Sequence, residues 1–592
     1  MRMIVALGLA LAGAAPAMAG CKVGMIAELP VTMEGRRPIV PAQINGQDAR
    51  FLLDSGAFWS LMAVASADRY GVRRVPAPPG FMLRGIGGSA EVTIGTIHTL
   101  TLAGQPVRDV QFLVGGSDTG NAGIIGQNFL GIGDVDYDLA HGVVRLMQAR
   151  GCGNFDMAYW AKGMAYAVIP IESMGPFQRH TIGTIAINGH AVRAVFDTGA
   201  ASSVLNLPVA ARAGLRPDSP GVRPAGLSSG IGRRMIQSWI APIDLLKIGG
   251  EEIRHINLRI ADLGPDTDML VGADFFLAHH IYVANSQRKM FLTYNGGPVF
   301  DLSVKAGAQM AAATAAAAAE TQPGSAPSGP APSQSEPGDA EGFSRRGAAS
   351  MARLDYADAL ADFDRAVTLA PREPRYLFQR AQAHMRLRRP ALARADLDAV
   401  LALKPDDVPA LLTSAEMRLH AGRLELARRD LDAAAAAMPS GANEQLDLGS
   451  LYAAMDAFDP AIAQFSLWLD SHRVDAHRAD ALRSRCRARA LAGRELDRAL
   501  DDCNTALHLL PKAAGTLDSR GFVHLRRGED DKALADYQAA LAINPTMAWA
   551  LYGKGLIERR RGETAEGDAD IAAAAALAPD LPARMKRYGL AP

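Results

Sequence analysis

Residues 44–56 read Ile-Asn-Gly-Gln-Asp-Ala-Arg-Phe-Leu-Leu-Asp-Ser-Gly, and residues 187–199 read Ile-Asn-Gly-His-Ala-Val-Arg-Ala-Val-Phe-Asp-Thr-Gly. In both copies the aspartate follows the glycine of the Asn-Gly pair at the same distance, since 54 − 46 and 197 − 189 are both 8. An Asn-Gly pair favours a two-residue hairpin turn, because both residues accept the positive φ of a type I′ turn. The sequence therefore predicts one hairpin twice, with a hydrophobic strand that ends at Asp54 or Asp197.

Two further landmarks follow each copy in the same order. A glycine-rich stretch lies about thirty residues after each aspartate, since 85 − 54 = 31 and 226 − 197 = 29, and it is expected to form a mobile hairpin tip. A hydrophobic-hydrophobic-Gly element follows, ending at Gly126 and Gly272, with offsets of 126 − 54 = 72 and 272 − 197 = 75. The glycines of the two tips are Gly85, Gly87 and Gly88 in the first copy and Gly230 and Gly232 in the second.

This set of landmarks resembles the retropepsin-like aspartic proteases over about residues 28–150 and 163–297. The resemblance implies two all-β barrels that form a pepsin-like pseudo-dimer and cleave peptide bonds. It assigns catalysis to Asp54 and Asp197, a flap to the glycine-rich tips, and a brace beneath the acid loops to Gly126 and Gly272. The remaining acid-loop residues are Ser55, Gly56, Thr198 and Gly199.

The chemistry of paired carboxyls supports the same assignment without the family. Peptide hydrolysis without a metal or a nucleophilic side chain requires one group to activate water and another to protonate the carbonyl oxygen or the leaving amine. Two carboxyls about 3 Å apart cannot both ionise, so they share one proton and supply both functions. Gly56 and Gly199 permit close backbone approach behind the acids.

Three alternatives stay open at this point. A lone Asp-Ser-Gly or Asp-Thr-Gly is more often an ordinary turn in which Asp caps its own backbone. The lobes either pair within one chain, because the connecting segment of about 15 residues spans up to ~50 Å when extended, or pair like with like between chains. Phe58-Trp59 in the first copy stands where the second has Ala201-Ser202, so these two aromatics either narrow the cleft or belong to the core.

Length and charge exclude some partners. A chain of 592 residues exceeds what one core supports, and several domains are expected. Lys+Arg and Asp+Glu both number 62, so no net field attracts nucleic acid, which is dropped as a partner. The spacing of Cys and His suggests neither a metal nor another cofactor.

Residues 1–19 have the features of a secretory signal: Met1-Arg2-Met3, an apolar run from Ile4 to about Ala14, and then Ala17-Met18-Ala19. No later segment has about 18 uninterrupted apolar residues, so no transmembrane segment is expected. The chain is predicted to be exported to the periplasm. Met18-Ala19-Gly20-Cys21 also resembles a lipoprotein box with Met in place of Leu, so lipid anchoring through Cys21 is the alternative.

Four cysteines are compatible with disulfides in an exported chain. Cys21 and Cys152 bracket the first lobe and are candidates to join its ends, whereas lipidation of Cys21 would leave Cys152 unpaired. Cys486 and Cys503 are predicted to form a second disulfide, with two buried free thiols as a nearly equal alternative.

Residues 305–341 are rich in Ala and then in Pro, Gly and Ser, and are predicted to be a disordered linker. Beyond them, prolines recur with a period of 34 at Pro371, Pro405 and Pro439, and again at Pro511, Pro545 and Pro579. Small residues recur in the same register at Gly347, Ala381, Ala415, Gly449, Gly521 and Gly555. The fourth repeat has Arg473 at the proline position, and the fifth is longer than the period, since 511 − 473 = 38, which implies a four-residue insertion.

This register resembles tetratricopeptide repeats, and residues 342–592 are predicted to form an all-α solenoid of seven repeats. Such a superhelix has a concave face that suits a peptide or protein partner. Three functions are compatible with the whole chain. The first is an exported aspartic endopeptidase whose repeats recruit a substrate or partner, and the second is a binding scaffold whose protease-like lobes no longer cut. The third, which is weaker, is self-processing within the linker only.

Overall fold

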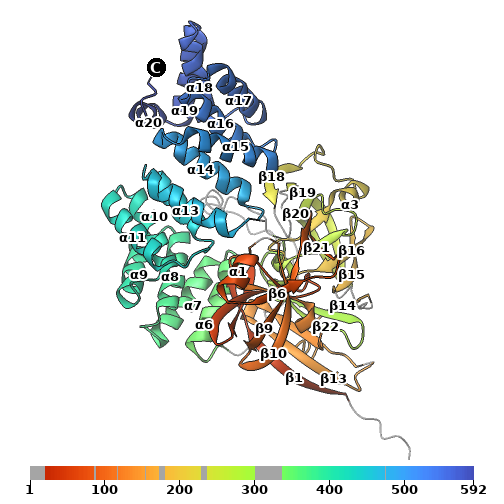
Figure 1. Ribbon diagram of the computed structural model, residues 1–592. Coiled ribbons are helices and arrows are strands. Elements are labelled where there is room, and N and C mark those ends of the chain that lie inside the picture. The colour runs from red at the N-terminus through yellow and green to blue at the C-terminus, as the bar shows by residue number, and fades with distance from the viewer. Residues whose placement is uncertain are drawn as a thin grey trace, which may run out of the picture.

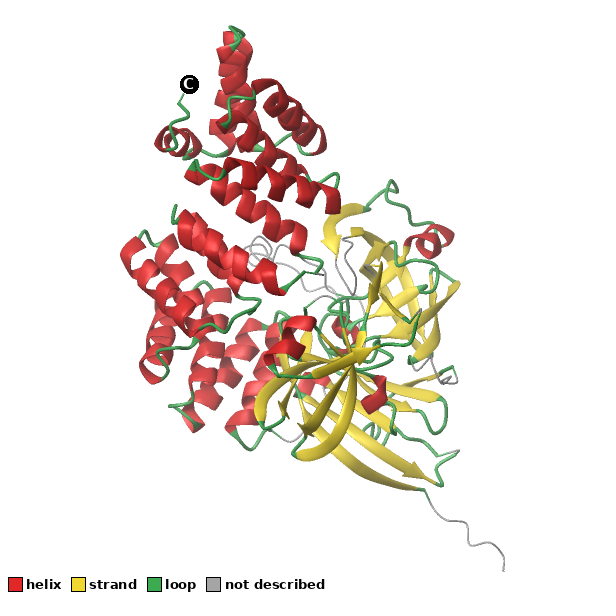
Figure 2. Ribbon diagram, viewed as in Figure 1, coloured by secondary structure: helices red, strands yellow, loops and turns green. Residues whose placement is uncertain are grey.

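The chain forms two β lobes and a helical solenoid, as shown by a computed structural model (Figures 1 and 2). The structure describes residues 21–591 except residues 80, 86, 87, 117, 154, 173–179, 229–235, 301–335 and 474. The predicted signal segment 1–19 therefore lies outside the described residues, as does most of the predicted linker. Among the described residues, no helix combines the length and apolar character that crossing a bilayer requires.

Lobe 1 is a closed barrel of six strands. The barrel closes because its first and last strands pair with each other: Ala42–Ile44 of the first strand lie opposite Leu100–Leu102 of the last. Short helices α1 (Val64–Arg69) and α2 (Gln127–Leu130) follow two of the barrel strands, and β2 (Thr32–Glu34) and β6 (Arg73–Pro76) extend the sheet. Around the barrel the strands are β3 (Arg37–Ile44), β4 (Gln47–Leu53), β11 (Gly123–Ile125), β5 (Leu61–Met62), β10 (Gln105–Val114) and β9 (Thr93–Leu102).

Lobe 2 repeats this barrel, with α3 (Leu207–Arg212) and α4 (Ala273–Phe276) in the places of α1 and α2. Both predicted Asn-Gly turns are present: φ is 51° and 83° at Asn45 and Gly46, and 48° and 83° at Asn188 and Gly189. The barrel strands are β15 (Ile182–Ile187), β16 (His190–Phe196), β21 (Met269–Val271), β17 (Val204–Asn206), β20 (Glu251–Ala261) and β19 (Ile236–Ile248), with β18 (Arg223–Ser228) at the edge.

A six-stranded sheet joins the two lobes within one chain. At its centre β12 of lobe 1 pairs antiparallel with β22 of lobe 2, and Asp136 lies opposite Tyr282. The two residues stand at the same offset from their bracing glycines, since 136 − 126 and 282 − 272 are both 10, so the pseudo-twofold axis passes through this pair. The strand order is β1 (Lys22–Pro30), β13 (Val143–Arg150), β12 (Asp134–Asp138), β22 (His279–Ala284), β23 (Lys289–Tyr294) and β14 (Ala167–Pro170).

The start of lobe 1 lies earlier than residue 28, the predicted boundary, because β1 begins at Lys22 and pairs with β13. A disulfide between Cys21 and Cys152 joins the residues that flank these two strands. The segment between the lobes covers one face of the sheet and supplies Tyr159, whose hydroxyl donates to the buried Asp136. On the sheet itself, His280 Nε2 lies 2.5 Å from the same carboxylate.

The solenoid contains seven helix pairs and a short final helix within its described residues. Small residues let the paired helices approach: a Cβ at Gly347 would lie 2.7 Å from the Phe363 ring, and one at Gly449 equally close to the Phe465 ring. The helices are α6 (Ala340–Ala352), α7 (Tyr356–Leu369), α8 (Pro374–Arg386), α9 (Pro390–Leu403), α10 (Val408–His420), α11 (Leu424–Ala437), α12 (Gln445–Ala454), α13 (Phe458–Ser471), α14 (Arg478–Ala492), α15 (Leu496–Leu509), α16 (Ala514–Arg526), α17 (Asp530–Ile543), α18 (Ala548–Arg560), α19 (Thr564–Leu577) and α20 (Leu581–Arg587).

The fifth repeat differs from its neighbours in how its two helices are joined. Cys486 on α14 and Cys503 on α15 form a disulfide where the first and fourth repeats place a glycine against a phenylalanine. This bond confirms the predicted pairing of the two cysteines.

The four residues of the predicted insertion in the fifth repeat lie at two different places. Arg485 stands further from Arg473 than Arg380 does from Pro371, since 485 − 473 = 12 and 380 − 371 = 9. The ion pair between Arg485 and Asp502 is also one position longer than its equivalent between Arg380 and Asp396, since 502 − 485 = 17 and 396 − 380 = 16. Three of the four extra residues therefore lie between Arg473 and Arg485, and one lies between Arg485 and Asp502.

The solenoid is docked on the β lobes at two separated places. Helix α6 begins at Ala340, because the Asp339 side chain caps it by accepting from Gly342 N at 2.8 Å. The last two residues of the predicted linker are therefore helical. Its Ala348, Ala349 and Ala352 join the core of the lobes. The second contact uses the connection between α13 and α14: His472 Nε2 lies 3.1 Å from Asp118 Oδ2, and Asp118 N donates to Asp475 Oδ2 at 2.7 Å.

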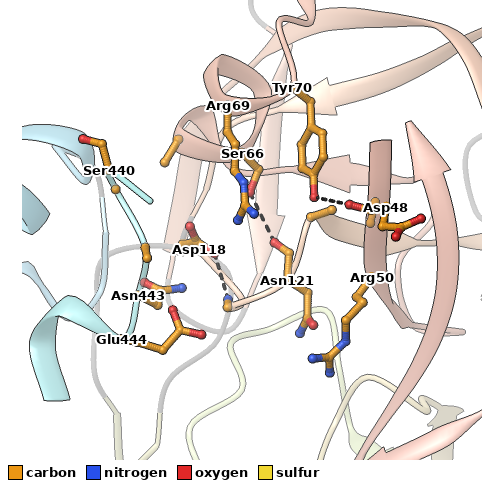
Figure 3. A pocket seen from close by; sticks show the side chains of 16 residues that line it. Asp48, Arg50, Ser66, Arg69, Tyr70, Asp118, Asn121, Ser440, Asn443 and Glu444 are labelled. Carbon is orange, nitrogen blue, oxygen red and sulfur yellow. Dashed lines mark hydrogen bonds between the residues drawn. The ribbon is translucent and has the colours of Figure 1, made fainter. Parts of the chain in front are cut away.

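A cavity of about 270 Å³ lies beside the second docking contact, between lobe 1 and the α11–α12 connection (Figure 3). Lobe 1 contributes Arg50, Arg69 and Asp118 to its lining, and the solenoid contributes Asn443 and Glu444. Neither predicted catalytic aspartate lines this cavity. The candidate site described below therefore lies elsewhere in the molecule.

Candidate active site

Each predicted catalytic aspartate is fixed at the end of a barrel strand. Asp54 follows β4 and donates its backbone N–H to Ile125 O at 3.0 Å, and Asp197 follows β16 and donates to Val271 O at 2.8 Å. In both lobes the partner carbonyl belongs to the hydrophobic-hydrophobic-Gly strand, which pairs in parallel with the acid-bearing strand. The strand pair thereby fixes the position of each acid loop relative to the barrel.

Ser55 and Thr198 lock the two acid loops to each other across the pseudo-twofold axis. Ser55 N donates to Thr198 Oγ1 at 3.0 Å, and Thr198 N donates to Ser55 Oγ at 2.9 Å. Each hydroxyl in turn donates to the opposite lobe, from Ser55 Oγ to Phe196 O and from Thr198 Oγ1 to Leu53 O, both at 2.8 Å. All four bonds are buried, so breaking one leaves an unsatisfied polar group at a cost of about 1–3 kcal/mol.

The glycines of the acid loops bring the two carboxyls together. A Cβ at Gly56 would lie 2.3 Å from Asp197 Cγ, and a Cβ at Gly199 would lie 2.3 Å from Asp54 Cγ. Each carboxyl therefore occupies the space that a side chain would need in the opposite loop. Only glycine permits this crossed arrangement.

The two carboxyls lie against each other, since each stands beside the glycine of the opposite acid loop, and two carboxyls this close share a proton. Burial raises the pKa of Asp54 well above its ordinary value, and the negative charge of Asp197 and a hydrogen bond that the protonated Asp54 donates to it raise that pKa further. The backbone N–H groups of Ala57 and Gly56 oppose this shift. In the other loop Asp197 Oδ1 accepts from Gly199 N at 2.8 Å. The arrangement is one titrating unit that keeps one acidic and one basic oxygen available.

The predicted bracing glycines lie directly under the acid loops. A Cβ at Gly126 would lie 2.7 Å from Ala57 O, and a Cβ at Gly272 would lie 2.6 Å from Ala200 O. The residues after these glycines donate to the same carbonyls, from Gln127 N at 2.9 Å and from Ala273 N at 2.8 Å. Close packing of backbone on backbone explains why both positions are glycine.

A second layer of support was not foreseen from the sequence. Ser60 Oγ and Ser203 Oγ accept from the N–H groups of the bracing glycines, at 3.0 and 2.8 Å. Asn128 holds Ser60, whereas the buried Asp274 holds Ser203, with Oδ1 distances of 2.8 and 2.7 Å from the serine hydroxyls. The equal offset of these two residues from the bracing glycines, 128 − 126 and 274 − 272, is the sequence feature that could have revealed them.

Tyr137 is a third supporting residue that the sequence did not reveal. It lies buried on β12 and interacts with the Ser55 side chain, while burial raises its pKa above the ordinary value. Its counterpart in lobe 2 is Val283, since 137 − 126 and 283 − 272 are both 11. Only the loop of lobe 1 therefore has a tyrosine hydroxyl beneath it.

The predicted flap of lobe 1 is a separate hairpin of β7 (Met82–Gly85) and β8 (Gly88–Glu91), in which Gly85 pairs with Gly88. In lobe 2, β18 pairs with the start of β19, and Ser228 lies opposite Ile236. Gly87, Gly230 and Gly232 lie outside the described residues.

Phe58 and Trp59 are half-buried and pack against a core cluster of lobe 1. Trp59 Nε1 also donates to Gln111 O at 3.1 Å, which holds the indole against β10. These contacts place both aromatics at the edge of the core.

Family comparisons assign both lobes to the same group of proteins. Residues 40–131 match a family model described as gag-polyprotein putative aspartyl protease, and residues 183–275 match one described as aspartyl protease. Both acid loops and both bracing glycines lie within the matched ranges. The chain therefore carries two aspartyl-protease-like lobes in tandem. No curated protein matches the chain significantly.

Solved structures similar to this chain include helical-repeat proteins. A tetratricopeptide repeat protein from Parabacteroides merdae is 15% identical, with a TM-score of 0.35, and covers 42% of this chain and 98% of its own. YrrB, described as a TPR protein with an unusual peptide-binding site, is 18% identical, with a TM-score of 0.28 over 32% of this chain and 97% of its own. The match to the Cut9–Hcn1 hetero-tetramer of the APC/C has 17% identity, a TM-score of 0.30, and coverage of 36% of this chain and 42% of that one.

Proposed function

We propose that the chain is an exported aspartic endopeptidase in which Asp54 and Asp197 activate water together, and in which the solenoid recruits a protein substrate or partner. The observation that carries the proposal is the close approach of the two carboxyls, each beside the glycine of the opposite acid loop, held by the crossed Ser55–Thr198 bonds. The matches of both lobes to aspartyl-protease models support it.

The shared proton supplies both catalytic functions. The ionised carboxylate takes a proton from water as the water oxygen bonds to the scissile carbonyl carbon, and the protonated carboxyl gives its proton to the carbonyl oxygen. The C–N bond then breaks as the amine nitrogen takes a proton from the pair and one hydroxyl of the diol returns a proton to it, which leaves a carboxylic acid, an amine and a singly protonated pair. Because burial and Asp197 raise the pKa of Asp54, the singly protonated pair persists to a higher pH than two independent aspartates would allow.

Export and partner recruitment rest on other features. Residues 1–19 have a signal-like pattern, and both disulfides suit an oxidising compartment such as the periplasm. Cys21 is bonded to Cys152, so the disulfide competes with the alternative of a lipid anchor at Cys21. Repeats of paired helices present extended surfaces suited to peptides and proteins.

The decisive experiment is digestion of a denatured protein mixture from acid to neutral pH by the wild type, Asp54→Asn and Asp197→Asn. We expect cleavage by the wild type and its loss in both variants, because each removes one half of the shared unit. Equal cleavage by all three, or none by the wild type at any pH, contradicts the proposal. In the second case the runner-up function, a binding scaffold with inactive lobes, is preferred. Cell fractionation with labelling of Cys21 tests the location.

A further inference from the structure

The cavity between lobe 1 and the solenoid has walls from two parts of the chain (Figure 3). Lobe 1 supplies residues of β4, of α1 and of the loop before β11, and the solenoid supplies the connection before α12. At about 30 Å³ per water-sized group, the cavity of about 270 Å³ has room for roughly nine such groups. This volume suits a single amino acid or a dipeptide.

The charged residues that line the cavity have both signs. Arg50 and Arg69 are cations, whereas Asp48, Asp118 and Glu444 are anions. Because three acids stand against two arginines, the lining does not favour a multiply charged anion such as phosphate. The two arginines in turn oppose an ion that carries only positive charge. The lining therefore favours a ligand with one charge of each sign.

Three of these charged side chains already have partners. Arg50 forms an ion pair with Glu34. Asp48 accepts a hydrogen bond at 3.0 Å, and the two carboxylate oxygens of Asp118 accept at 2.8 Å and lie 3.1 Å from a histidine nitrogen of the solenoid. These three residues are therefore committed to contacts of the protein itself.

Arg69 and Glu444 are different, since neither side chain has a hydrogen bond or an ion pair with any of the described residues. The Arg69 guanidinium lies 5.5 Å from the centre of the Tyr70 ring, a cation–π contact that leaves its N–H groups able to donate. Glu444 is half-buried on the solenoid wall, and Arg69 lies on the lobe 1 wall (Figure 3). A cation and an anion without partners thus line one cavity from different walls.

We propose that this cavity binds a zwitterion of amino-acid or dipeptide size, whose carboxylate accepts from Arg69 and whose ammonium group donates to Glu444. A guanidinium presents a fork of N–H donors that matches a carboxylate, and charge-assisted hydrogen bonds of this kind are the strong ones. The bound molecule bridges lobe 1 and the solenoid, so it stabilises their docking. The site is separate from the acid pair and does not require that the lobes cut peptides.

Lobe 2 offers a matched control for Arg69. Arg69 on α1 and Arg212 on α3 follow their aspartates at the same distance, since 69 − 54 and 212 − 197 are both 15. Both arginines are exposed, but Arg212 lies outside the lining of the cavity. Arg212→Gln therefore removes the same charge at the equivalent position and leaves the proposed site intact.

The test is calorimetric titration of the full chain with glycylglycine, its N-acetyl form and its C-terminal amide. We expect the unblocked dipeptide to bind most tightly, because each block removes one of its two charges. Arg69→Gln and Glu444→Gln should each weaken the binding of glycylglycine by about 10- to 100-fold, the effect of losing a hydrogen bond to a charged group. Arg212→Gln should not change it, and neither should Asp54→Asn, which alters the acid pair.

The match between each ligand charge and its residue is the most specific check. Arg69→Gln should bind the amide as weakly as it binds glycylglycine, and Glu444→Gln should do the same with the acetyl form, because the contact is already lost. Equal binding of the three dipeptides to the wild type, or no heat of binding at millimolar concentrations, would overturn the proposal whether or not the variants fold. Unchanged binding in both variants, or its loss in Asp54→Asn, would also overturn it.

Hydrogen exchange tests whether the ligand joins the two walls. Exchange of residues 115–122 and 440–444 should slow in the presence of glycylglycine, because the bridge holds both segments in place. Binding that leaves exchange unchanged at either wall would contradict the proposed bridge.

Discussion

Lobe 1 and lobe 2 have the same hydrogen-bond pattern in their acid loops but differ in the residues that support these loops. The crossed Ser55–Thr198 bonds and the two bracing glycines obey the pseudo-twofold axis. The supporting residues do not: Asn128 of lobe 1 corresponds to Asp274 of lobe 2, and Tyr137 corresponds to Val283. Lobe 1 alone makes the described contact with the α13–α14 connection, through Asp118. The geometry of the paired carboxyls is thus symmetric, and their environment is not.

The symmetric part gives the largest predicted effect. Gly56→Ala and Gly199→Ala should each reduce kcat by about 100-fold or more, because either methyl group displaces the opposite carboxyl and a shift of about 1 Å has that effect. Steady-state kinetics on a cleavable peptide measure the loss. Gly250→Ala, at a glycine that likewise lacks a positive φ but has open space around it, is the control for replacing a glycine by alanine. A tenfold difference between the two active-site variants would break the symmetry claimed for the acid loops.

The contact with the solenoid should give the next largest effect. Asp118→Asn removes a buried charge from His472 and should weaken docking by about 1.5–3 kcal/mol. Burial lowers the pKa of His472. The hydrogen bond to Asp118 and the weaker interactions that act with it outweigh this effect, so the pKa is raised overall. The stabilisation of docking is therefore full below pH 6.5 and is lost as the pH rises through the raised pKa.

Hydrogen exchange of residues 115–122 and 470–478 between pH 6 and 8 measures this docking. In the wild type exchange should quicken as the pH rises, beyond the intrinsic pH dependence, and in Asp118→Asn it should be fast throughout. Asp262→Asn, at an exposed residue of lobe 2, is the control. Protection that is independent of pH in the wild type would show that the ion pair does not hold the solenoid.

The single tyrosine beneath the acid loops should give a smaller effect. Tyr137→Phe removes the interaction of the phenol hydroxyl with the Ser55 side chain and should cost about 1 kcal/mol of stability and lower kcat by a few-fold. Tyr282→Phe is the matched control, since its hydroxyl donates to Asp134 at 3.2 Å and does not touch the acid loops. An equal fall in kcat for both variants would assign the effect of Tyr137 to the sheet and not to Ser55.

The smallest effect concerns the residues that hold Ser60 and Ser203. Burial raises the pKa of Asp274, so its contribution to stability is full below the unfolded pKa of about 3.8 and is lost as the pH rises through the folded value. Asp274→Asn should remove this loss. Relative to the wild type, the free energy of unfolding of the variant should therefore be about 1 kcal/mol higher at neutral pH than in acid. Denaturant unfolding between pH 4 and 7 measures it, and Asn128→Asp should introduce the same loss in lobe 1. A pH-independent difference from the wild type would contradict this account.

The parts of the site that could be predicted from the sequence are those with a repeated local pattern. Asp54 and Asp197 each follow an Asn-Gly turn and precede a bracing glycine at similar offsets, and the regular register of prolines and small residues placed the helix pairs. Tyr137 carries no pattern of its own, because its place beneath the acid loop arises from the pairing of strands between the two lobes. The six-stranded sheet was missed for the same reason, since its edge strands β1 and β14 are defined only by their partners. The insertion in the fifth repeat was visible, but its contact with Asp118 was not.

The strand pair on the pseudo-twofold axis has a further consequence for how such a molecule changes over time. In a dimer of identical chains every amino-acid replacement occurs in both halves, so an improvement on one side must be tolerated on the other. Here Asp136 and Tyr282 face each other at the axis although they belong to one polypeptide. Each half can therefore accept its own mutations, and one half is free to specialise in contacting the solenoid while the other tunes the chemistry.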